Sequence, residues 1–301
     1  MYGRYAKFTD KVYKNTYPAI DASRPELSQE GKTVLITGGH TGIGYGISRA
    51  FLRASAAKVI VLGRRKDVLA TATKKLAAEA GAGAGEVVGV PCDITDAAAV
   101  DAVWAKLRDE GVVVDVLVLS VSVFAPKKPL LEVGTADVWK LYDTNVRAQL
   151  QLTERFYKQE GKGASATKNL IYISTVGIHD FIRIASDSLG YGLTKHASHL
   201  TMQLIAQETP PEKMQVISYH PGAVFTEAAA AAGWTEETLD WDNVDLPGHY
   251  AVWAASPEAK FLHGRYTWAA WDVEQLKHGE LRKRIDEDPT FLRIGVNGLN
   301  E

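Results

Sequence analysis

Seven short apolar runs, separated by segments with a helical pattern, constrain the fold of this chain more than any other feature of its sequence. Each run is continuous rather than alternating, which is typical of strands buried on both faces of a parallel sheet. Strands that alternate with helices over this length predict an α/β fold that is doubly wound, with seven parallel strands, helices on both faces and right-handed crossovers. The runs are Thr33–Thr37, Lys58–Leu62, Val87–Val90, Val112–Leu119, Asn169–Ser174, Gln215–Tyr219 and Gly264–Trp268.

The domain organisation follows from where these patterns begin and end. The chain has 301 residues, of which 46% are hydrophobic, so it is long enough for one domain with a substantial core. Residues 1–30 show no clear strand or helix period, and we interpret them as an extension packed on the domain. Residues 31–301 are expected to form that single domain.

The composition excludes several classes of function. A net charge of −2 and a pI of about 6.5 give no general attraction to nucleic acid or to an anionic membrane surface. Cys92 is the single cysteine, so neither an internal disulfide nor a cysteine-rich zinc site is expected. His40 and His179 have no metal-ligand companions at suitable spacing, and no metal is predicted. The N-terminus lacks the apolar core of a signal peptide, and no run reaches about 18 apolar residues, so we expect a soluble, cytoplasmic protein.

A glycine triplet stands between the first apolar run and an amphipathic helix. Gly38, Gly42 and Gly44 occur in the segment TGGHTGIG, directly after Thr33–Thr37. The first glycine allows a sharp turn, the second a close approach of backbone to a pyrophosphate, and the third tight packing of helix on sheet. The helix N-terminus then offers free N–H groups to phosphates. The alternative is a glycine-rich turn that binds no ligand.

The end of the second run bears on cofactor choice. An acidic residue there would accept hydrogen bonds from a ribose 2′-hydroxyl and favour NAD. This chain has Gly63 followed by Arg64 and Arg65, and a guanidinium is a bidentate partner for the additional phosphate of NADP. The alternative is a solvated basic turn. Asp93 follows the third run and is placed either to bind the adenine amino group or to cap a helix, and both are compatible.

Tyr191 and Lys195 in YGLTK lie four residues apart, on one face of a predicted helix. A tyrosine with an ordinary pKa near 10 exchanges protons poorly at neutral pH. A neighbouring ammonium group and an oxidised nicotinamide both favour the phenolate and lower that pKa. Such a tyrosine donates its proton to a carbonyl oxygen as hydride arrives, or removes one from an alcohol in the reverse direction.

These motifs together resemble the short-chain dehydrogenase/reductase family, in its single-domain Rossmann branch. The TGGHTGIG loop, the CDI turn, DTNV, IST, YGLTK and the HPG turn occur in the family's order over roughly residues 30 to 270. Segments at both ends of the chain look similar to a fungal subgroup of NADP-dependent reductases, many of them in secondary metabolism.

The resemblance implies a catalytic set. Tyr191 would be the acid/base, Lys195 would lower its pKa and bind the nicotinamide ribose, and Asn145 would anchor a water that supplies protons to Lys195. The alternative for Asn145 is a buried asparagine that serves packing alone. Aligning IST on the family pattern places Thr175, rather than Ser174, at the substrate-orienting hydroxyl. The interval from Thr175 to Tyr191 exceeds the usual spacing by three residues, and an insertion around residues 180–188 is expected to reshape the pocket rim.

The resemblance also implies a cofactor site for NADP(H). Thr226, after the Pro-Gly turn, should hold the nicotinamide carboxamide, and the Val224 backbone N–H should assist. The residues expected to contact the cofactor are Gly38, His40, Thr41, Gly42, Ile43, Gly44, Arg64, Arg65, Asp93, Ile94, Leu119, Ser120, Tyr191, Lys195, Pro221, Gly222, Val224 and Thr226.

The fourth run departs from the family pattern. Where the family has Asn-Asn-Ala-Gly, this chain has LSVS at residues 119–122. Three interpretations of this exchange are open. It shifts local packing alone, since Ser120 and Ser122 keep hydrogen-bonding hydroxyls. Alternatively, it changes the position of the cofactor, or it removes the redox step.

Residues at about 226–247 are expected to form a lid over the substrate. Trp234, Leu239, Trp241 and Leu246 in this segment indicate an apolar or aromatic-lined pocket for a bulky substrate, or an ordinary packing contact. The resemblance implies pairing into a homodimer or homotetramer through the helices that bear Asn145 and Tyr191.

Three functions follow from these patterns. The first is an NADPH-dependent oxidoreductase that reduces a carbonyl, or oxidises the alcohol, of a bulky small molecule. The second keeps the cofactor pocket for non-redox chemistry, as in a cyclase, isomerase or dehydratase, and is motivated by LSVS and the long interval before Tyr191. The third is a non-catalytic NADP(H) sensor, which would have no need of the Tyr191, Lys195 and Asn145 set.

Overall fold

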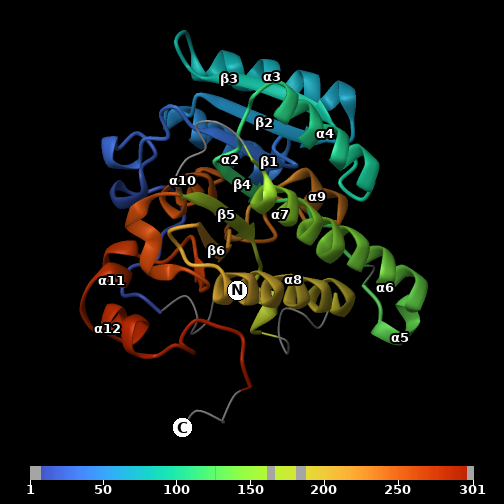
Figure 1. Ribbon diagram of the computed structural model, residues 1–301. Coiled ribbons are helices and arrows are strands. Elements are labelled where there is room, and N and C mark those ends of the chain that lie inside the picture. Colours follow the sequence, from blue (N-terminus) through green and yellow to red (C-terminus); the bar gives the residue numbers. More distant parts are fainter. Residues whose placement is uncertain (1–7, 126, 161–166, 181–187, 297–301) are drawn as a thin grey trace.

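The computed structural model describes residues 8–125, 127–160, 167–180 and 188–296 of the chain. A seven-stranded parallel sheet runs through the described part in the order β3-β2-β1-β4-β5-β6-β7, with helices on both faces (Figure 1). This confirms the predicted doubly wound α/β fold. The strands are β1 (Thr33–Thr37), β2 (Lys58–Gly63), β3 (Glu86–Pro91), β4 (Val116–Leu119), β5 (Lys168–Ile173), β6 (Met214–His220) and β7 (Tyr266–Trp268).

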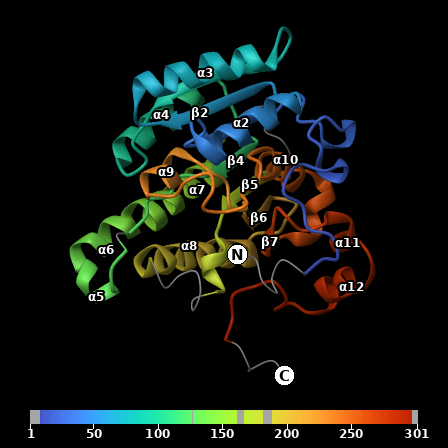
Figure 2. The ribbon, with the colours of Figure 1, turned by 180° about the vertical axis from the view of Figure 1, so that it is seen from behind.

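Successive residues of the strands face opposite layers of helices. Val34 and Ile36 of β1 belong to one core cluster, and Leu35 between them belongs to the other. The first cluster lies under α2, α3, α10, α11 and α12, and the second lies under α4, α7 and α8 (Figures 1 and 2). Because both faces are covered, the strands read as unbroken apolar runs.

The helices vary widely in length, and the longest, α8, bears the Tyr191–Lys195 pair. Their bounds are α2 (Gly42–Arg53), α3 (Lys66–Ala80), α4 (Ala97–Asp109), α5 (Leu130–Val133), α6 (Thr135–Tyr142), α7 (Ala148–Lys158), α8 (Leu189–Glu208), α9 (Glu227–Ala231), α10 (Asp245–Ala254), α11 (Val273–Lys277) and α12 (Gly279–Glu287). Within the described residues, no helix is both long and apolar enough to cross a membrane.

Two strands are shorter than the sequence pattern predicts. The fourth begins at Val116 and not at Val112, because Val114 bonds through both its N–H and its carbonyl to the Gln159 side chain, at 2.9 and 2.6 Å. The seventh begins at Tyr266, because Gly264 turns the chain at a φ of +72° just before it. Hydrophobic character alone cannot distinguish such buried approach segments from the strands themselves.

The N-terminal segment from Phe8 onward packs on the layer formed by α10 and the end of β7. The Phe8 ring stacks on Trp271 with centroids 4.2 Å apart, and the Tyr17 hydroxyl donates to the Trp271 carbonyl at 2.7 Å. Ile20 and Leu27 are fully buried in the same core cluster. These contacts attach the segment to the same core cluster on which α2 packs.

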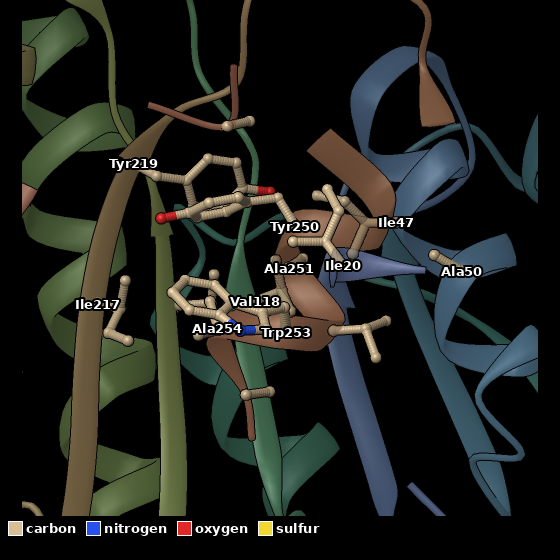
Figure 3. Packing of buried hydrophobic residues seen from close by; sticks show 14 of the residues in the cluster. Ile20, Ile47, Ala50, Val118, Ile217, Tyr219, Tyr250, Ala251, Trp253 and Ala254 are labelled. Carbon is tan, nitrogen blue, oxygen red and sulfur yellow. The ribbon is translucent and has the colours of Figure 1, made fainter. Parts of the chain in front are cut away.

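Figure 3 shows the centre of this layer, where Trp253 of α10 lies among Ile217, Tyr219 and Tyr250. Trp253 has no exposed surface. Replacing it by Ala is expected to lower the free energy of unfolding by about 3–5 kcal/mol, because the cavity cannot collapse between sheet and helix. Urea denaturation measures the loss, and Trp253→Phe, which retains most of the volume, should cost less than half as much. A loss below about 1 kcal/mol for Trp253→Ala would contradict this account of the core.

Candidate active site

A cleft of about 610 Å³ opens at the carboxyl ends of the strands, on both sides of β1. The strand order reverses there, with β2 and β3 on one side of β1 and β4 to β7 on the other, and this is where doubly wound sheets bind ligands. Its lining begins at Gly38 after β1 and passes the ends of β2, β3 and β4 to Ser174 and Pro221 after β5 and β6. A groove of similar volume between α4 and α7 touches no such strand end, and its rim is ion-paired, as in Arg155 with Asp101.

The glycine loop between β1 and α2 closes the deep side of the cleft. A Cβ on Gly44 would lie 2.3 Å from the Gly38 carbonyl oxygen, so α2 can start this close to the turn only with glycine there. Helix α2 begins at Gly42, and no side chain caps its first N–H groups. Five of the six predicted loop residues line the cleft, namely Gly38, His40, Thr41, Ile43 and Gly44. The sixth, Gly42, lies against Thr226, where a Cβ on the glycine would be 3.0 Å from Thr226 Cγ2.

Arg64 and Arg65 line the cleft at the end of β2, together with His40 from the loop after β1. Arg64 and Arg65 are largely exposed, and within the described part of the chain they make only long ion pairs, Arg64 with Asp93 at 3.9 Å and Arg65 with Glu227 at 3.5 Å. Exposed pairs of this length contribute little to stability, so both guanidinium groups can engage another anion at small cost.

The turn after β3 places Asp93 and Ile94 in the cleft lining. The Asp93 carboxylate accepts hydrogen bonds from the Thr95 N–H and hydroxyl, at 3.0 and 2.7 Å. The interpretation of Asp93 as a helix cap is wrong, because the cap of α4 is Asp96, which accepts from the N–H groups of Ala98 and Ala99. The residue that caps a helix depends on where the chain turns, and two acidic residues three positions apart are equally suited by type.

The LSVS segment lines the cleft and leaves it open. The Thr37 hydroxyl accepts hydrogen bonds from the N–H groups of Ser120 and Val121, at 2.9 and 3.2 Å, and so ties the end of β4 to β1. Ser120, Val121 and Ser122 all face the cavity, whereas Leu119 is buried in the core behind it. The departure at residues 119–122 therefore changes which groups hold the strand end. It also places the Val121 side chain beside Gly38, where a Cβ on the glycine would lie 3.1 Å from Val121 Cγ2.

Asn145 lies in a π-helical turn, η3 (Asp143–Arg147), that interrupts α6 and α7. Its Oδ1 accepts from the Val123 N–H at 2.8 Å and the Ser122 hydroxyl at 3.2 Å. Its Nδ2 donates to the Val123 carbonyl and the Thr194 hydroxyl, both at 2.9 Å. The side chain has no hydrogen-bonding capacity left for a water. The backbone carbonyl of Asn145, which the wider π-helical turn leaves free, accepts a hydrogen bond from the Ser198 hydroxyl.

Tyr191 stands at the end of the cleft, on the first turns of α8. The hydroxyl groups of Thr175 and Ser122 both act to lower the pKa of its phenol. The exposed Phe124 ring stacks on it at 4.6 Å between centroids. Burial raises the pKa of Tyr191 to about 12, and the two hydroxyl groups only partly oppose the rise. In the chain by itself Lys195 does not lower this pKa, contrary to the sequence-based expectation, so the phenol is protonated at neutral pH.

Lys195 lies one turn further along α8 and is 3% exposed. Its ammonium group donates to the Ile173 carbonyl and lies 4.3 Å from the centre of the Tyr172 ring. Burial lowers the pKa of Lys195 to about 7, since no carboxylate compensates for the lost water. Both members of the Tyr–Lys pair are thus neutral over part of the physiological pH range.

Ser174 and Thr175 have different surroundings. The Ser174 hydroxyl lies 3.3 Å from His199 Nδ1 in the buried layer beneath the site, although part of the residue lines the cleft. The Thr175 hydroxyl lowers the pKa of Tyr191 and accepts from the Gly177 N–H at 3.2 Å. Thr175 is therefore the hydroxyl beside the phenol.

The Pro-Gly turn after β6 closes the other side of the cleft. Pro221 and Thr226 line it, and the Thr226 hydroxyl caps α9 by accepting from the Ala229 N–H at 3.2 Å. Gly222 has a φ of +94°, and the buried Asp242 carboxylate accepts from the Ala223 N–H at 2.7 Å directly beneath it. Val224 is buried outside the lining.

The segment expected to form the lid divides into two parts. Phe225, Trp234 and Trp241 form one cluster, with Trp241 5.3 Å from Phe225 and 5.6 Å from Trp234 between ring centroids. Leu246, in contrast, is fully buried in α10, so the interpretation of Leu246 as a pocket residue is wrong. Of the expected insertion at 180–188, residues 181–187 lie outside the described part of the chain.

The sequence analysis did not identify three residues that contact Tyr191 or the Pro-Gly turn. Ser122 was considered only as a strand tie, and Phe124 and Asp242 were not identified, because each acts across a long sequence separation. An acidic residue directly after a tryptophan, as in Trp241-Asp242, was the one available signal. No cluster of three potential metal ligands occurs among the described residues.

The fold and the cleft define a nucleotide-binding α/β protein with a tyrosine–lysine pair at the cleft end. Residues 32–237 match the family described as short chain dehydrogenase. Similar curated proteins include short chain dehydrogenase/reductases of Aspergillus aculeatus, 34% identical over 96% of this chain and 96% of that protein, and of Aspergillus novofumigatus, 36% identical over 95% and 96%. Another, from Claviceps purpurea, is 34% identical over 95% and 93%. The chain belongs to the short-chain dehydrogenase/reductase family and is an oxidoreductase of that family.

Solved structures show the same architecture. A short-chain type dehydrogenase/reductase from Mycobacterium ulcerans superposes with a TM-score of 0.71, at 25% identity over 80% of this chain and 89% of that one. An NADP complex of Pseudomonas aeruginosa RhlG superposes with a TM-score of 0.72, at 21% identity over 81% and 97%. The second likeness concerns the fold alone.

Proposed function

We propose that the protein is an NADP(H)-dependent oxidoreductase that reduces a carbonyl group, or oxidises the corresponding alcohol, of a bulky and largely apolar small molecule. The observation that carries the proposal is that Tyr191, Lys195 and Ser122 line one end of a cleft that begins at the glycine loop, with the Thr175 and Ser122 hydroxyls both acting on the Tyr191 phenol. A proton donor and an orienting hydroxyl thus stand together beside a nucleotide-sized space.

The residues present fit a dinucleotide. The Gly38–Gly44 contact leaves uncapped N–H groups of α2 facing the cleft, and these suit a pyrophosphate. Arg64, Arg65 and His40 would surround a 2′-phosphate, and no carboxylate stands at Gly63 to prefer a 2′-hydroxyl. Known structures of this fold, such as the RhlG complex, hold NADP. Asp93 and Ile94 would contact the adenine, and Lys195, Pro221 and Thr226 would hold the nicotinamide end.

The chain's own residues manage the proton. The reduced nicotinamide supplies the hydride when bound. Tyr191, whose pKa of about 12 keeps it protonated, donates its proton to the carbonyl oxygen, and Thr175 orients that oxygen by a hydrogen bond. Lys195, as an ammonium group, returns a proton to the Tyr191 phenolate. A nearby anion favours the ammonium form of Lys195. Asn145 positions this array by holding Ser122 and Thr194.

The substrate class follows from the aromatic rim. Phe124 is 58% exposed although it stacks on Tyr191, so one of its faces is open beside the reacting group. Trp234 and Trp241 pack with each other in the segment after the Pro-Gly turn, outside the cleft lining. Apolar ring surface around one convergent set of hydroxyls suits a bulky, planar or apolar ketone.

Helices α7 and α8 also present apolar side chains to solvent. Leu150, Leu193 and Leu204 are 45%, 40% and 49% exposed. We infer that these helices pair two or four copies of the chain, and sedimentation velocity of the purified protein should show a dimer or tetramer.

The test combines binding with turnover. Titration with NADPH and NADH, followed by fluorescence, should show tighter binding of NADPH. Adding a panel of bulky ketones should then consume NADPH, measured by loss of its absorbance. Binding without turnover of any ketone would count against the reductase, and binding of neither nucleotide would refute the proposal as a whole.

Replacing Thr175 by Val should lower kcat/KM for a ketone substrate by about 100-fold, because the isosteric side chain loses the hydroxyl that orients the carbonyl oxygen. Ser174→Ala, the matched control, should change kcat/KM by less than about threefold, since that hydroxyl faces His199. Steady-state kinetics of the two variants decides between the hydroxyls, and a larger loss for Ser174→Ala would reverse the assignment.

A further inference from the structure

Lys195 is the one lysine among the described residues that is buried, and little around it compensates the charge of its ammonium group. Of the three N–H donors of that group, one donates to the Ile173 carbonyl. The titratable groups that face it are Tyr191 and His199 on its own helix and Tyr172 on β5. Burial lowers the pKa of His199 to about 3, so this imidazole is neutral. Burial alone accounts for the lowered pKa of Lys195, and no carboxylate acts on it.

The ring of Tyr172 lies against this ammonium group, with Nζ of Lys195 4.3 Å from the ring centroid. Tyr172 is 1% exposed, and its neighbours Ile171 and Ile173 belong to the opposite core cluster, so strand alternation directs its side chain toward α8. In the described strands β4, β5 and β6, the other members of its cluster are not aromatic: Leu117, Leu119, Leu170, Met214 and Val216. The aromatic ring on this face of the three strands thus lies at the buried lysine.

Tyr172 attracts the ammonium group as a neutral ring and not as an anion. Burial raises the pKa of its phenol far above the ordinary value, and the Ser198 side chain opposes this only in part. The attraction therefore comes from the negative π face of the ring. A cation within about 6 Å of such a face is held most strongly where water is excluded from both partners, as it is here.

We propose that Tyr172 is a positioning residue for Lys195: its π face takes the place of a carboxylate and holds the ammonium group between the Ile173 carbonyl and the cleft. The inference rests on the proposed function, because it concerns the lysine that returns protons to Tyr191. A carboxylate at this place would hold the proton on Lys195 in an ion pair. A ring compensates the charge only in part, so the buried ammonium group can still release its proton.

This role makes the titration of Lys195 depend on the charge of the Tyr172 ring. Withdrawing electrons from the ring weakens the attraction and lowers the pKa of Lys195 below its value of about 7. Ketone reduction uses the ammonium form, so activity is present below this pKa and is lost as the pH rises through it. A weaker ring therefore moves the loss of activity to lower pH.

The decisive experiment replaces Tyr172 in the full chain by phenylalanine and by phenylalanines that carry one, two or three ring fluorines. Fluorine changes the charge of the π face stepwise and changes the shape of the ring little. NMR of protein labelled with 13C at lysine Cε follows the titration of Lys195, whose signal is identified by its loss in Lys195→Met. Tyr172→Phe should titrate within about 0.3 pH units of wild type, and the midpoint should fall by about one pH unit in total with three fluorines.

Kinetics of ketone reduction gives a second readout. The pH at which kcat falls to half should move downward through the same series, by the amount that NMR measures with NADPH bound. KM for the ketone should change by less than about twofold, because Tyr172 is not part of the cleft lining. A residue that only filled space beneath the site would not link ring charge to the pH profile.

Phe51 provides the matched control. Its ring is also fully buried, in the other core cluster, and within the described part of the chain no cation lies over it. Trifluorophenylalanine at position 51 should leave the Lys195 titration unchanged. A midpoint that stays constant or rises through the fluorine series at position 172 would overturn this inference and leave the proposed function intact. Failure of the wild type to bind NADPH or to reduce a ketone would refute the proposed function, while the NMR series without cofactor still decides the role of Tyr172.

Discussion

Tyr191→Phe is expected to lower kcat for ketone reduction by about 10³-fold, while the Kd for NADPH changes by less than about twofold. The substitution removes one oxygen atom and keeps the ring that stacks with Phe124. The site loses the proton donor, and general acid catalysis contributes about 10²- to 10⁴-fold. Stopped-flow absorbance of NADPH measures the chemical step, and a fluorescence titration measures binding.

Tyr45→Phe is the control for this prediction. Tyr45 lies on α2 and is not part of the cleft lining, so kcat should stay within about twofold of wild type. If Tyr191→Phe retained more than about a tenth of the wild-type kcat, the phenol would not be the proton donor. A parallel loss of NADPH binding would mean that Tyr191 acts by shaping the cofactor site.

Lys195→Met is expected to abolish most of the activity and at the same time to stabilise the chain without cofactor. Activity should fall at least about 100-fold, because no ammonium group remains to resupply the phenol. The free energy of unfolding at pH 7.5 should rise by roughly 2–4 kcal/mol, since a buried lysine whose pKa is lowered to about 7 costs free energy that a methionine does not. Urea denaturation without cofactor measures this gain.

The titration of Lys195 determines how the free energy of unfolding changes with pH. In the unfolded chain the lysine titrates near 10.4, so between about pH 7 and that value the unfolded state binds more protons than the folded state. The stability of the wild type therefore rises with pH, by up to about 1.4 kcal/mol per pH unit from this group, while that of Lys195→Met does not. The advantage of the variant should narrow to near zero by about pH 10.

Lys32→Met is the matched control for the lysine prediction. Burial also lowers the pKa of Lys32, which lies before β1 at the opposite end of the strand from the cleft. Its replacement should leave kcat unchanged and alter stability in the same direction by a smaller amount. A Lys195→Met protein with wild-type stability at every pH would show that water or an anion already compensates the ammonium group.

The sequence by itself predicted the positions of the strands along the chain and their parallel direction, because the strands inside the sheet are buried on both faces and appear as unbroken apolar runs. It also predicted which chemical groups gather at the cleft, since the carboxyl ends of parallel strands meet at one edge of the sheet. Gly38 after β1, Arg64 after β2, Asp93 after β3 and Ser174 after β5 all line one cavity for this reason.

Local pattern failed where a side chain from elsewhere completes the backbone. Gln159 takes up both polar groups of Val114, and the strand that the run at Val112 predicts begins only at Val116. Asp96 rather than Asp93 caps α4 for a similar reason, as the direction of the turn selects between two carboxylates of the same type.

Only the tertiary structure decided which hydroxyls act on Tyr191 and which residue packs on the end of β2. Ser122 and Thr175 reach the phenol from two different strand ends, and Ser174 turns to His199 although it is adjacent in sequence to Thr175. The packing of His40 on Gly63 joins two loops whose sequences carry no sign of each other. Residue types and their order are written along the chain, but distances between side chains on different elements arise only when the sheet brings those elements together.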